Sequence, residues 1–152
     1  RPEDLAEAVS WMVRLNRDAS KAASECDVRG ATDITGFSFT GHALELAEAS
    51  HVGLRVDYDR LPILESARTY AAKFIFPGGA YDNRLYFQSR VQHEIDLPEE
   101  DQMLLYDPQT SGGLLLAVPG TSVDSFETRM KELDAPCWQV GEVVEGDGIV
   151  IG

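Results

Sequence analysis

The sequence predicts a single α+β domain in which helices pack on one face of a mostly antiparallel sheet. Three observations support this class. Several stretches carry apolar residues at helical spacing, others alternate or run continuously apolar as strands do, and residues 137–152 read as two strands joined by a Gly-Asp-Gly turn. A chain of 152 residues is long enough to bury one core, so we expect the domain to span residues 1–152.

In the first half of the chain, apolar residues repeat at helical spacing over residues 5–19 and predict one long first helix. A second helix is expected over residues 39–50. Residues 54–58 alternate apolar with charged side chains, which is the pattern of a half-buried strand. A short helix is expected to follow over residues 65–73.

In the second half, a Pro-Gly-Gly break precedes residues 80–96, which show no readable period. A short helix lies between the two prolines of residues 97–108, and residues 111–120 predict a strand entered through two glycines. A further helix is expected over residues 123–133. The last two strands, within residues 137–152, predict a hairpin.

Composition and charge restrict the function. The formal net charge of -13 argues against charge-driven binding to nucleic acid or to an anionic membrane, and no apolar run approaches the roughly 20 residues needed to span a bilayer. Two isolated cysteines, Cys26 and Cys137, form neither a disulfide framework nor a zinc site, so we expect a reducing, cytoplasmic location. The chain begins without Met and almost inside a helix, so we expect a piece of a longer protein.

The stretch "ATDITGFSFTGHALELAEA" places the carboxylate of Asp33 just ahead of the second helix. An Asp is a hard oxygen ligand suited to Mg²⁺, which takes one or two carboxylates together with waters and phosphate oxygens. Thr35 and Gly36 follow it and are candidates for the same ligand-binding cleft. The alternative is that Asp33 or Thr35 merely caps the following helix.

Two further glycine-containing turns are candidates for ligand contact. In "DPQTSGG" the hydroxyls of Thr110 and Ser111 could donate to a phosphate, and Gly112 and Gly113 let the backbone approach another surface closely. The alternative is a turn that only leads into the strand. "PGGAYDN" is equally ambiguous and lacks the lysine and spacing of a phosphate-binding loop.

The remaining chemically distinctive residues read as structural. The three histidines, His42, His51 and His93, have no metal-ligand spacing, and His42 is expected in the core or at an interface. The cysteines read as small buried hydrophobes, and Trp11 and Trp138 are expected to fill the core.

Four segments, "ATDITGFSFTGHALELA", "FPGGAYDN", "DPQTSGGLLLAVP" and "QVGEVVEG", occur in an order that resembles the C-terminal domain of selenophosphate synthetase, also called selenide, water dikinase. The resemblance covers essentially the whole chain. It also implies membership of a superfamily of two-domain ATP-binding proteins that includes aminoimidazole ribonucleotide synthetase and thiamine monophosphate kinase.

The resemblance implies a phosphotransferase reaction in which ATP, selenide and water give selenophosphate, AMP and phosphate. Asp33 falls on the family's metal-site carboxylate, so the resemblance implies that Asp33 is a Mg²⁺ ligand at a cleft between two domains. Most ATP contacts and the reactive Cys or selenocysteine belong to an N-terminal domain that this chain lacks, and neither cysteine here matches that nucleophile. No catalytic residue is therefore expected in this chain. The isolated chain should be inactive and monomeric, whereas the complete protein should be a homodimer.

Two positions depart from the family pattern. Ser38 stands where the family usually has Gly, and Ala80 where it usually has Thr. Because a Cβ disfavours positive φ, we expect either ordinary backbone at position 38 or a divergent member. The alternatives are an ATP-dependent enzyme of the same fold acting on another acceptor, and a non-catalytic protein-binding domain.

Overall fold

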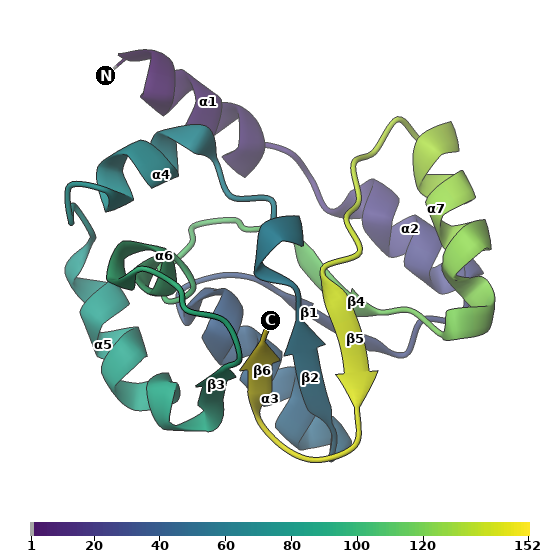
Figure 1. Ribbon diagram of the computed structural model, residues 1–152. Coiled ribbons are helices and arrows are strands. Elements are labelled where there is room, and N and C mark those ends of the chain that lie inside the picture. The colour runs from purple at the N-terminus through teal and green to yellow at the C-terminus, as the bar shows by residue number, and fades with distance from the viewer. Residues whose placement is uncertain (1) are drawn as a thin grey trace.

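The computed structural model describes residues 2–152 (Figure 1). The helices are α1 (Pro2–Met12), α2 (Arg17–Glu25), α3 (Ser38–Ser50), α4 (Glu65–Ala71), α5 (Gly78–Phe87), α6 (Glu99–Leu104) and α7 (Val123–Glu132). The strands are β1 (Gly30–Asp33), β2 (Gly53–Val56), β3 (Val91–His93), β4 (Leu114–Ala117), β5 (Gly141–Val144) and β6 (Ile149–Ile151), and short 3-10 turns are η1 (Tyr58–Arg60), η2 (Gln88–Arg90) and η3 (Gly120–Ser122).

The strands form two sheets, one of four strands in the order β3-β6-β2-β5 and one formed by β1 and β4. The β1–β4 and β2–β5 pairs are antiparallel, whereas β2–β6 and β3–β6 are parallel. The predicted α+β class is confirmed. The larger sheet, however, is mixed rather than mostly antiparallel.

The predicted terminal hairpin is wrong. A turn does reverse the chain between β5 and β6, with positive φ at Gly146 and Gly148, but β2 lies between the two strands. Gly141 permits the close approach of β5 to β2: a Cβ at this position would clash with the carbonyl oxygen of Arg55, so a larger residue could not fit. A turn signal therefore predicted the reversal of the chain but not the neighbour of each strand.

The predicted long first helix is also wrong, because α1 and α2 are separate. Ala22 and Ala23 of α2 pack against Phe126 and Met130 of α7 in a small satellite core. Helix α1, in contrast, has no buried residue. The helical period continued across the break because the exposed Leu15 happens to extend it.

Trp11 and Trp138 do not fill the core. They are 37% and 49% exposed and pack against each other at the surface, with ring centroids 6.0 Å apart. The pair fastens α1 to the segment before β5, and the Arg14 guanidinium reinforces it by donating to the Asp134 carbonyl at 3.0 Å.

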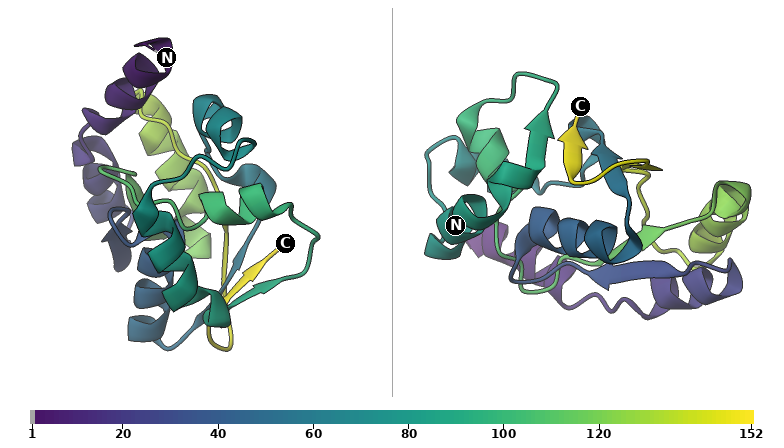
Figure 2. Two further views of the ribbon diagram at one scale, coloured as in Figure 1. Left: turned by 90° about the vertical axis from the view of Figure 1, so that its left-hand side faces the viewer. Right: turned by 90° about the horizontal axis from the view of Figure 1, so that it is seen from below.

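The main core lies where α3 meets the inner face of the larger sheet. Ala43 and Leu44 of α3 pack with Val56, Ile149 and Ile151 of the sheet, all at most 3% exposed. Figure 2, in its right-hand view, shows α3 between this sheet and the β1–β4 pair. The opposite face of the larger sheet carries exposed polar residues, as expected for a sheet covered by helices on one face.

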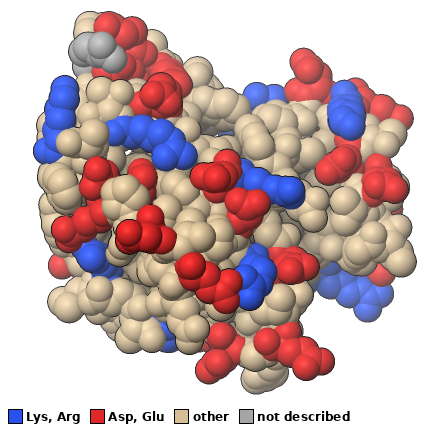
Figure 3. Space-filling view, viewed as in Figure 1, with Lys and Arg blue, Asp and Glu red and all other residues tan. Residues whose placement is uncertain are grey.

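Acidic side chains spread over the face seen in Figure 3, and basic ones lie among them instead of gathering in one patch. Many of the basic residues are in ion pairs, such as Arg90 with Glu48 and Arg129 with Glu25. Among residues 2–152, no helix combines the length and the apolar character needed to cross a bilayer.

Candidate functional site

Two of the predicted motifs lie side by side. The pairing of β1 with β4 continues beyond Asp33, because Ile34 donates its N–H to the Gly113 carbonyl (2.9 Å) and accepts from the Gly112 N–H (2.8 Å). One residue further on, the Gln109 N–H donates to the Thr35 carbonyl at 3.0 Å. Residues 33–36 and 109–113, called here the paired segments, therefore form one continuous edge that contains every predicted metal and cofactor residue.

The third motif supports this edge from behind. Asn83, only 8% exposed, donates from Nδ2 to the carbonyl oxygens of Gly36 (3.0 Å) and Tyr106 (3.1 Å). Its helix, α5, begins within "PGGAYDN", and a Cβ at Gly79 would lie 3.2 Å from the ring of Pro108. This motif thus holds the two others in place through the Asn83 side-chain amide and through close packing of Gly79 against Pro108.

Asp33 ends β1 opposite Leu114, and its side chain is exposed. Within residues 2–152, no hydrogen bond or ion pair reaches its carboxylate. The helix-cap alternative is wrong for Asp33 and Thr35, because the N-cap of α3 is Phe37 and no side chain caps it. An unpaired, exposed carboxylate offers the hard oxygen ligand that Mg²⁺ prefers, so this residue fits the implied ion.

Asp33 would offer a metal ion only one protein carboxylate. The described part of the chain contains no group of three or more His, Cys, Asp or Glu side chains placed to hold a metal ion. Since Mg²⁺ takes only one or two protein carboxylates when substrate phosphates and waters complete its shell, one carboxylate suits a shared site.

The hydroxyl of Thr35 points to α3. Its Oγ1 lies 3.0 Å from Nε2 of His42, which is also 3.3 Å from the Phe37 N–H, and Nδ1 of His42 lies 3.1 Å from the Glu45 carboxylate. The His42 side chain is 12% exposed. His42 is therefore a largely buried residue, as predicted, but its contact with a candidate ligand-binding residue was not foreseen.

Ser38 adopts a left-handed backbone, with φ of +70°. It is fully buried, its N–H donates to the Thr35 carbonyl at 2.9 Å, and its Oγ accepts from the Gly41 N–H at 3.4 Å. The expectation of an ordinary backbone conformation at position 38 is therefore wrong. The turn has the conformation that glycine adopts freely, and a serine sustains it at an energetic cost.

The turn before β4 contains the other candidates. Thr110 and Gly112 are exposed, and Ser111 and Gly113 are half-buried. Gly113 has φ of +87°, and a Cβ at Gly112 would lie 2.9 to 3.0 Å from Ile34, so both glycines are needed to bring this turn against β1. Whether either hydroxyl contacts a phosphate stays a prediction.

Asp107 is a residue of this region that the sequence interpretation missed. Burial raises the pKa of its carboxyl to about 6, and Gln109 donates to it from Nε2 at 3.1 Å. Its place at the start of "DPQTSGG", directly before a proline, was the only available signal. The carboxylate lies in the loop that leads to the paired segments.

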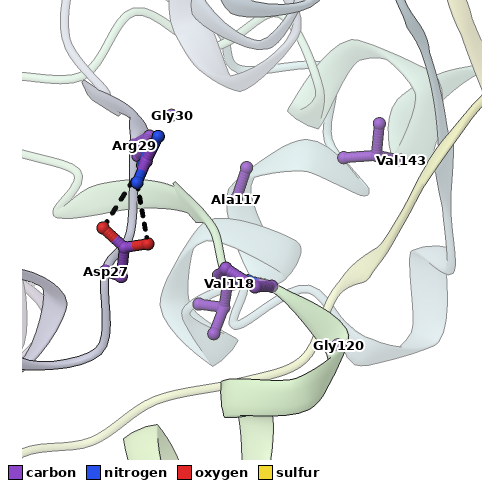
Figure 4. A pocket seen from close by; sticks show the side chains of 8 residues that line it. Asp27, Arg29, Gly30, Ala117, Val118, Gly120 and Val143 are labelled. Carbon is purple, nitrogen blue, oxygen red and sulfur yellow. Dashed lines mark hydrogen bonds and ion pairs between the residues drawn. The ribbon is translucent and has the colours of Figure 1, made fainter.

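Two surface hollows lie away from the paired segments. One of about 380 Å³, shown in Figure 4, is lined by residues 27–30, residues 117–120 and Val143 of β5. It lies at the Gly30 end of β1, whereas Asp33 is at the other end of this strand. The Arg29 guanidinium at its mouth is paired with the Asp27 carboxylate at 3.1 Å.

Of the cysteines, Cys137 is exposed and Cys26 is half-buried, so the buried assignment is wrong for Cys137.

A mixed four-stranded sheet, a second two-stranded sheet and α3 between them define an α+β domain of the kind found in aminoimidazole ribonucleotide synthetase and its relatives. The chain belongs to this family: the family model "AIR synthase related protein, C-terminal domain" matches residues 1–152.

Within this family, the chain is similar to curated selenide, water dikinases. The chain is 38% identical over 151 residues to a selenide, water dikinase of Pseudomonas aeruginosa, covering 99% of this chain and 43% of that protein. It is 40% identical over 141 residues to a selenide, water dikinase of Caldanaerobacter subterraneus, covering 91% of this chain and 40% of that protein. The chain thus spans about two fifths of the length of these relatives.

Solved structures support the fold. A structure of tt0281 from Thermus thermophilus aligns with a TM-score of 0.59 at 21% identity, covering 86% of this chain and 33% of that one. AaThiL, in a structure "complexed with AMPPCP and TMP", aligns with a TM-score of 0.56 at 18% identity, covering 88% and 33%.

Proposed function

We propose that this chain is the C-terminal domain of an ATP-dependent selenide, water dikinase, which forms selenophosphate, AMP and phosphate from ATP, selenide and water. The observation that carries the proposal is the convergence of three motifs, through Asn83 and the paired segments, at one edge that ends in an unpaired carboxylate. The identity of 38% to a curated selenide, water dikinase over 99% of the chain supports the same reaction.

In this proposal Asp33 contributes one oxygen ligand to a Mg²⁺ ion at a cleft between two domains. When bound, that ion would neutralise phosphate oxygens, so that attack on phosphorus meets less repulsion. The chain's own residues position the ligand: the Ile34 hydrogen bonds fix the end of β1, and Asn83 holds the following carbonyl. Thr35, Gly36, Thr110, Ser111, Gly112 and Gly113 form the wall beside it.

The rest of the active site is proposed to come from an N-terminal domain of the same chain. That the curated relatives are more than twice as long as this chain supports such a domain, which would bind most of the ATP and carry the reactive Cys or selenocysteine. We expect the isolated chain to fold, to bind ATP weakly and to lack turnover, since one carboxylate is a poor site. The complete protein is proposed to be a cytoplasmic homodimer that binds neither nucleic acid nor membrane.

The experiment is AMP formation from ATP by the complete protein, measured with and without selenide, with selenophosphate followed by ³¹P NMR. The proposal expects AMP and selenophosphate to appear together and only when selenide is present. ATP consumption that does not depend on selenide would point to another acceptor, and folded protein that consumes no ATP would favour a protein-binding domain.

A further inference from the structure

A chain of three side chains runs from the surface of α3 to the paired segments. The Glu45 carboxylate lies 3.1 Å from Nδ1 of His42, and Nε2 of the same ring lies 3.0 Å from Oγ1 of Thr35 and 3.3 Å from the Phe37 amide. Glu45 is exposed, whereas the His42 side chain is 12% exposed. The ring is thus held at both nitrogens.

We assign the hydrogens of this group from the Phe37 contact. A backbone amide can only donate, so Nε2 of His42 is an acceptor and the ring carries its proton on Nδ1, which donates to Glu45. Since Nε2 has no hydrogen, the Thr35 hydroxyl must donate to it. The only hydrogen of that hydroxyl is therefore directed into the protein, and its oxygen keeps lone pairs for another partner.

Thr35 follows Asp33 by two residues, and the buried Ile34 lies between them. The β1–β4 pairing continues through Ile34, which is 7% exposed and faces the core. In an extended segment successive side chains alternate in direction, which would put the Asp33 side chain and the outer side of the Thr35 oxygen on the side opposite Ile34. The edge thus presents a carboxylate next to a hydroxyl that can accept but not donate.

We propose that His42 is a positioning residue which, together with Glu45, holds the Thr35 hydroxyl as an acceptor for the hydrated divalent cation that Asp33 binds. The inference rests on the proposed function, because it requires a cation at this edge. It also assigns Thr35 a ligand class: an oxygen whose hydrogen is committed to His42 serves the cation or its bound water, and it does not donate to a phosphate oxygen.

The test is Mn²⁺ binding to the complete protein, measured by EPR of the free ion, beside Mg²⁺-dependent turnover. Thr35→Val and His42→Leu should each weaken Mn²⁺ binding about 10-fold, within the range for residues that orient metal ligands. The double variant should bind no more weakly than Thr35→Val alone, because His42 acts through that hydroxyl. Thr35→Ser and His42→Gln, which keep the hydroxyl and an acceptor, should bind within about 3-fold of wild type.

Controls separate this role from folding and from the proposed function. Thr128→Val and His93→Leu change the same residue types at exposed positions and should leave Mn²⁺ binding unchanged. If His42→Leu fails to fold, Glu45→Ala at the exposed end of the chain of contacts should still weaken binding, and ¹⁵N NMR of the wild-type ring should show hydrogen on Nδ1 only.

Three results would overturn the inference. The first is that Thr35→Val binds Mn²⁺ as wild type does while Asp33→Asn binds it weakly, which would mean that Asp33 binds the cation without help from Thr35. Additive losses in the double variant would mean that His42 does not act through Thr35. Unchanged binding in Asp33→Asn would remove the cation site itself, and both proposals would fail.

Discussion

The side-chain amide of Asn83 donates to the Gly36 carbonyl at 3.0 Å, and thereby ties a residue of α5 to the turn that follows Asp33. A second hydrogen bond from the same nitrogen reaches the Tyr106 carbonyl at 3.1 Å. One buried amide therefore connects the "PGGAYDN" motif with the turn after Asp33 and with the residue directly before "DPQTSGG". The position of the candidate cation ligand depends on this connection.

Asn83→Ala should destabilise this chain by about 1 to 3 kcal/mol, because it removes the donor from the buried Tyr106 carbonyl and from the more exposed Gly36 carbonyl. Urea unfolding measures the change. Asn16→Ala is the matched control: no capping hydrogen bond is made by the Asn16 side chain, so its loss should cost about 0.5 kcal/mol or less. Equal effects of the two substitutions would contradict the role of Asn83.

Ser38→Gly should stabilise the chain by about 0.5 to 1 kcal/mol. Glycine removes the cost of a Cβ at φ of +70°, which outweighs the extra entropy of glycine in the unfolded state. Ser38→Val, with a branched side chain in the same backbone conformation, should destabilise it by about 2 kcal/mol or more. A Ser38→Gly variant less stable than wild type in chemical denaturation would show that the backbone is not strained there.

Gly112→Ala should disturb the paired segments, whereas Gly36→Ala should be tolerated. A Cβ at Gly112 would lie within 3.0 Å of the Ile34 backbone and side chain, but a Cβ at Gly36 meets nothing within 4 Å. We expect a loss of about 1 to 3 kcal/mol for the first and a change within about 0.5 kcal/mol for the second. Hydrogen exchange of the Gly112 and Ile34 amides would report the disturbance directly, and unchanged protection in Gly112→Ala would refute it.

Asp107→Asn should stabilise the chain at high pH but not at low pH. Burial raises the pKa of Asp107 from 3.8 to about 6, so the folded state binds the proton more tightly than the unfolded state. Stability is therefore lost as the pH rises between these two values, and the full cost is present above about pH 6. Because the side chain is partly exposed, solvent screens its charge, and we expect about 1 kcal/mol of stabilisation at pH 8, falling towards zero near pH 4. A gain that is independent of pH would contradict burial as its source.

The sequence was informative where a local pattern decides the structure. Helix α3 is at its expected place, and β2 and β4 follow from alternation and from a continuous apolar run. The sequence prediction failed where the structure depends on which strand or helix an element packs against. The β5–β6 turn was predicted correctly, yet β2 lies between these strands, because the close approach at Gly141 is a tertiary fact that no local pattern encodes.

The candidate site was predicted in the same uneven way. Asp33 and the Thr110–Gly113 turn were predicted from their residue types and from the family resemblance. Nothing in the sequence showed that backbone hydrogen bonds join the two segments. The His42–Thr35 hydrogen bond depends on the left-handed turn at Ser38, which brings the start of α3 back over the strand. Asp107 was missed because its shifted pKa arises from burial, which spacing does not reveal.

The central claim is that Asp33 completes a cation site in an enzyme that makes selenophosphate. The most direct measurement is selenide-dependent AMP formation by the complete protein, with Asp33→Asn beside wild type and Asp124→Asn, at an exposed position of α7, as the matched control. We predict that Asp33→Asn loses at least about 100-fold in Mg²⁺-dependent turnover while its unfolding curve stays close to wild type, and that Asp124→Asn keeps its activity. Wild-type turnover in Asp33→Asn would contradict the claim.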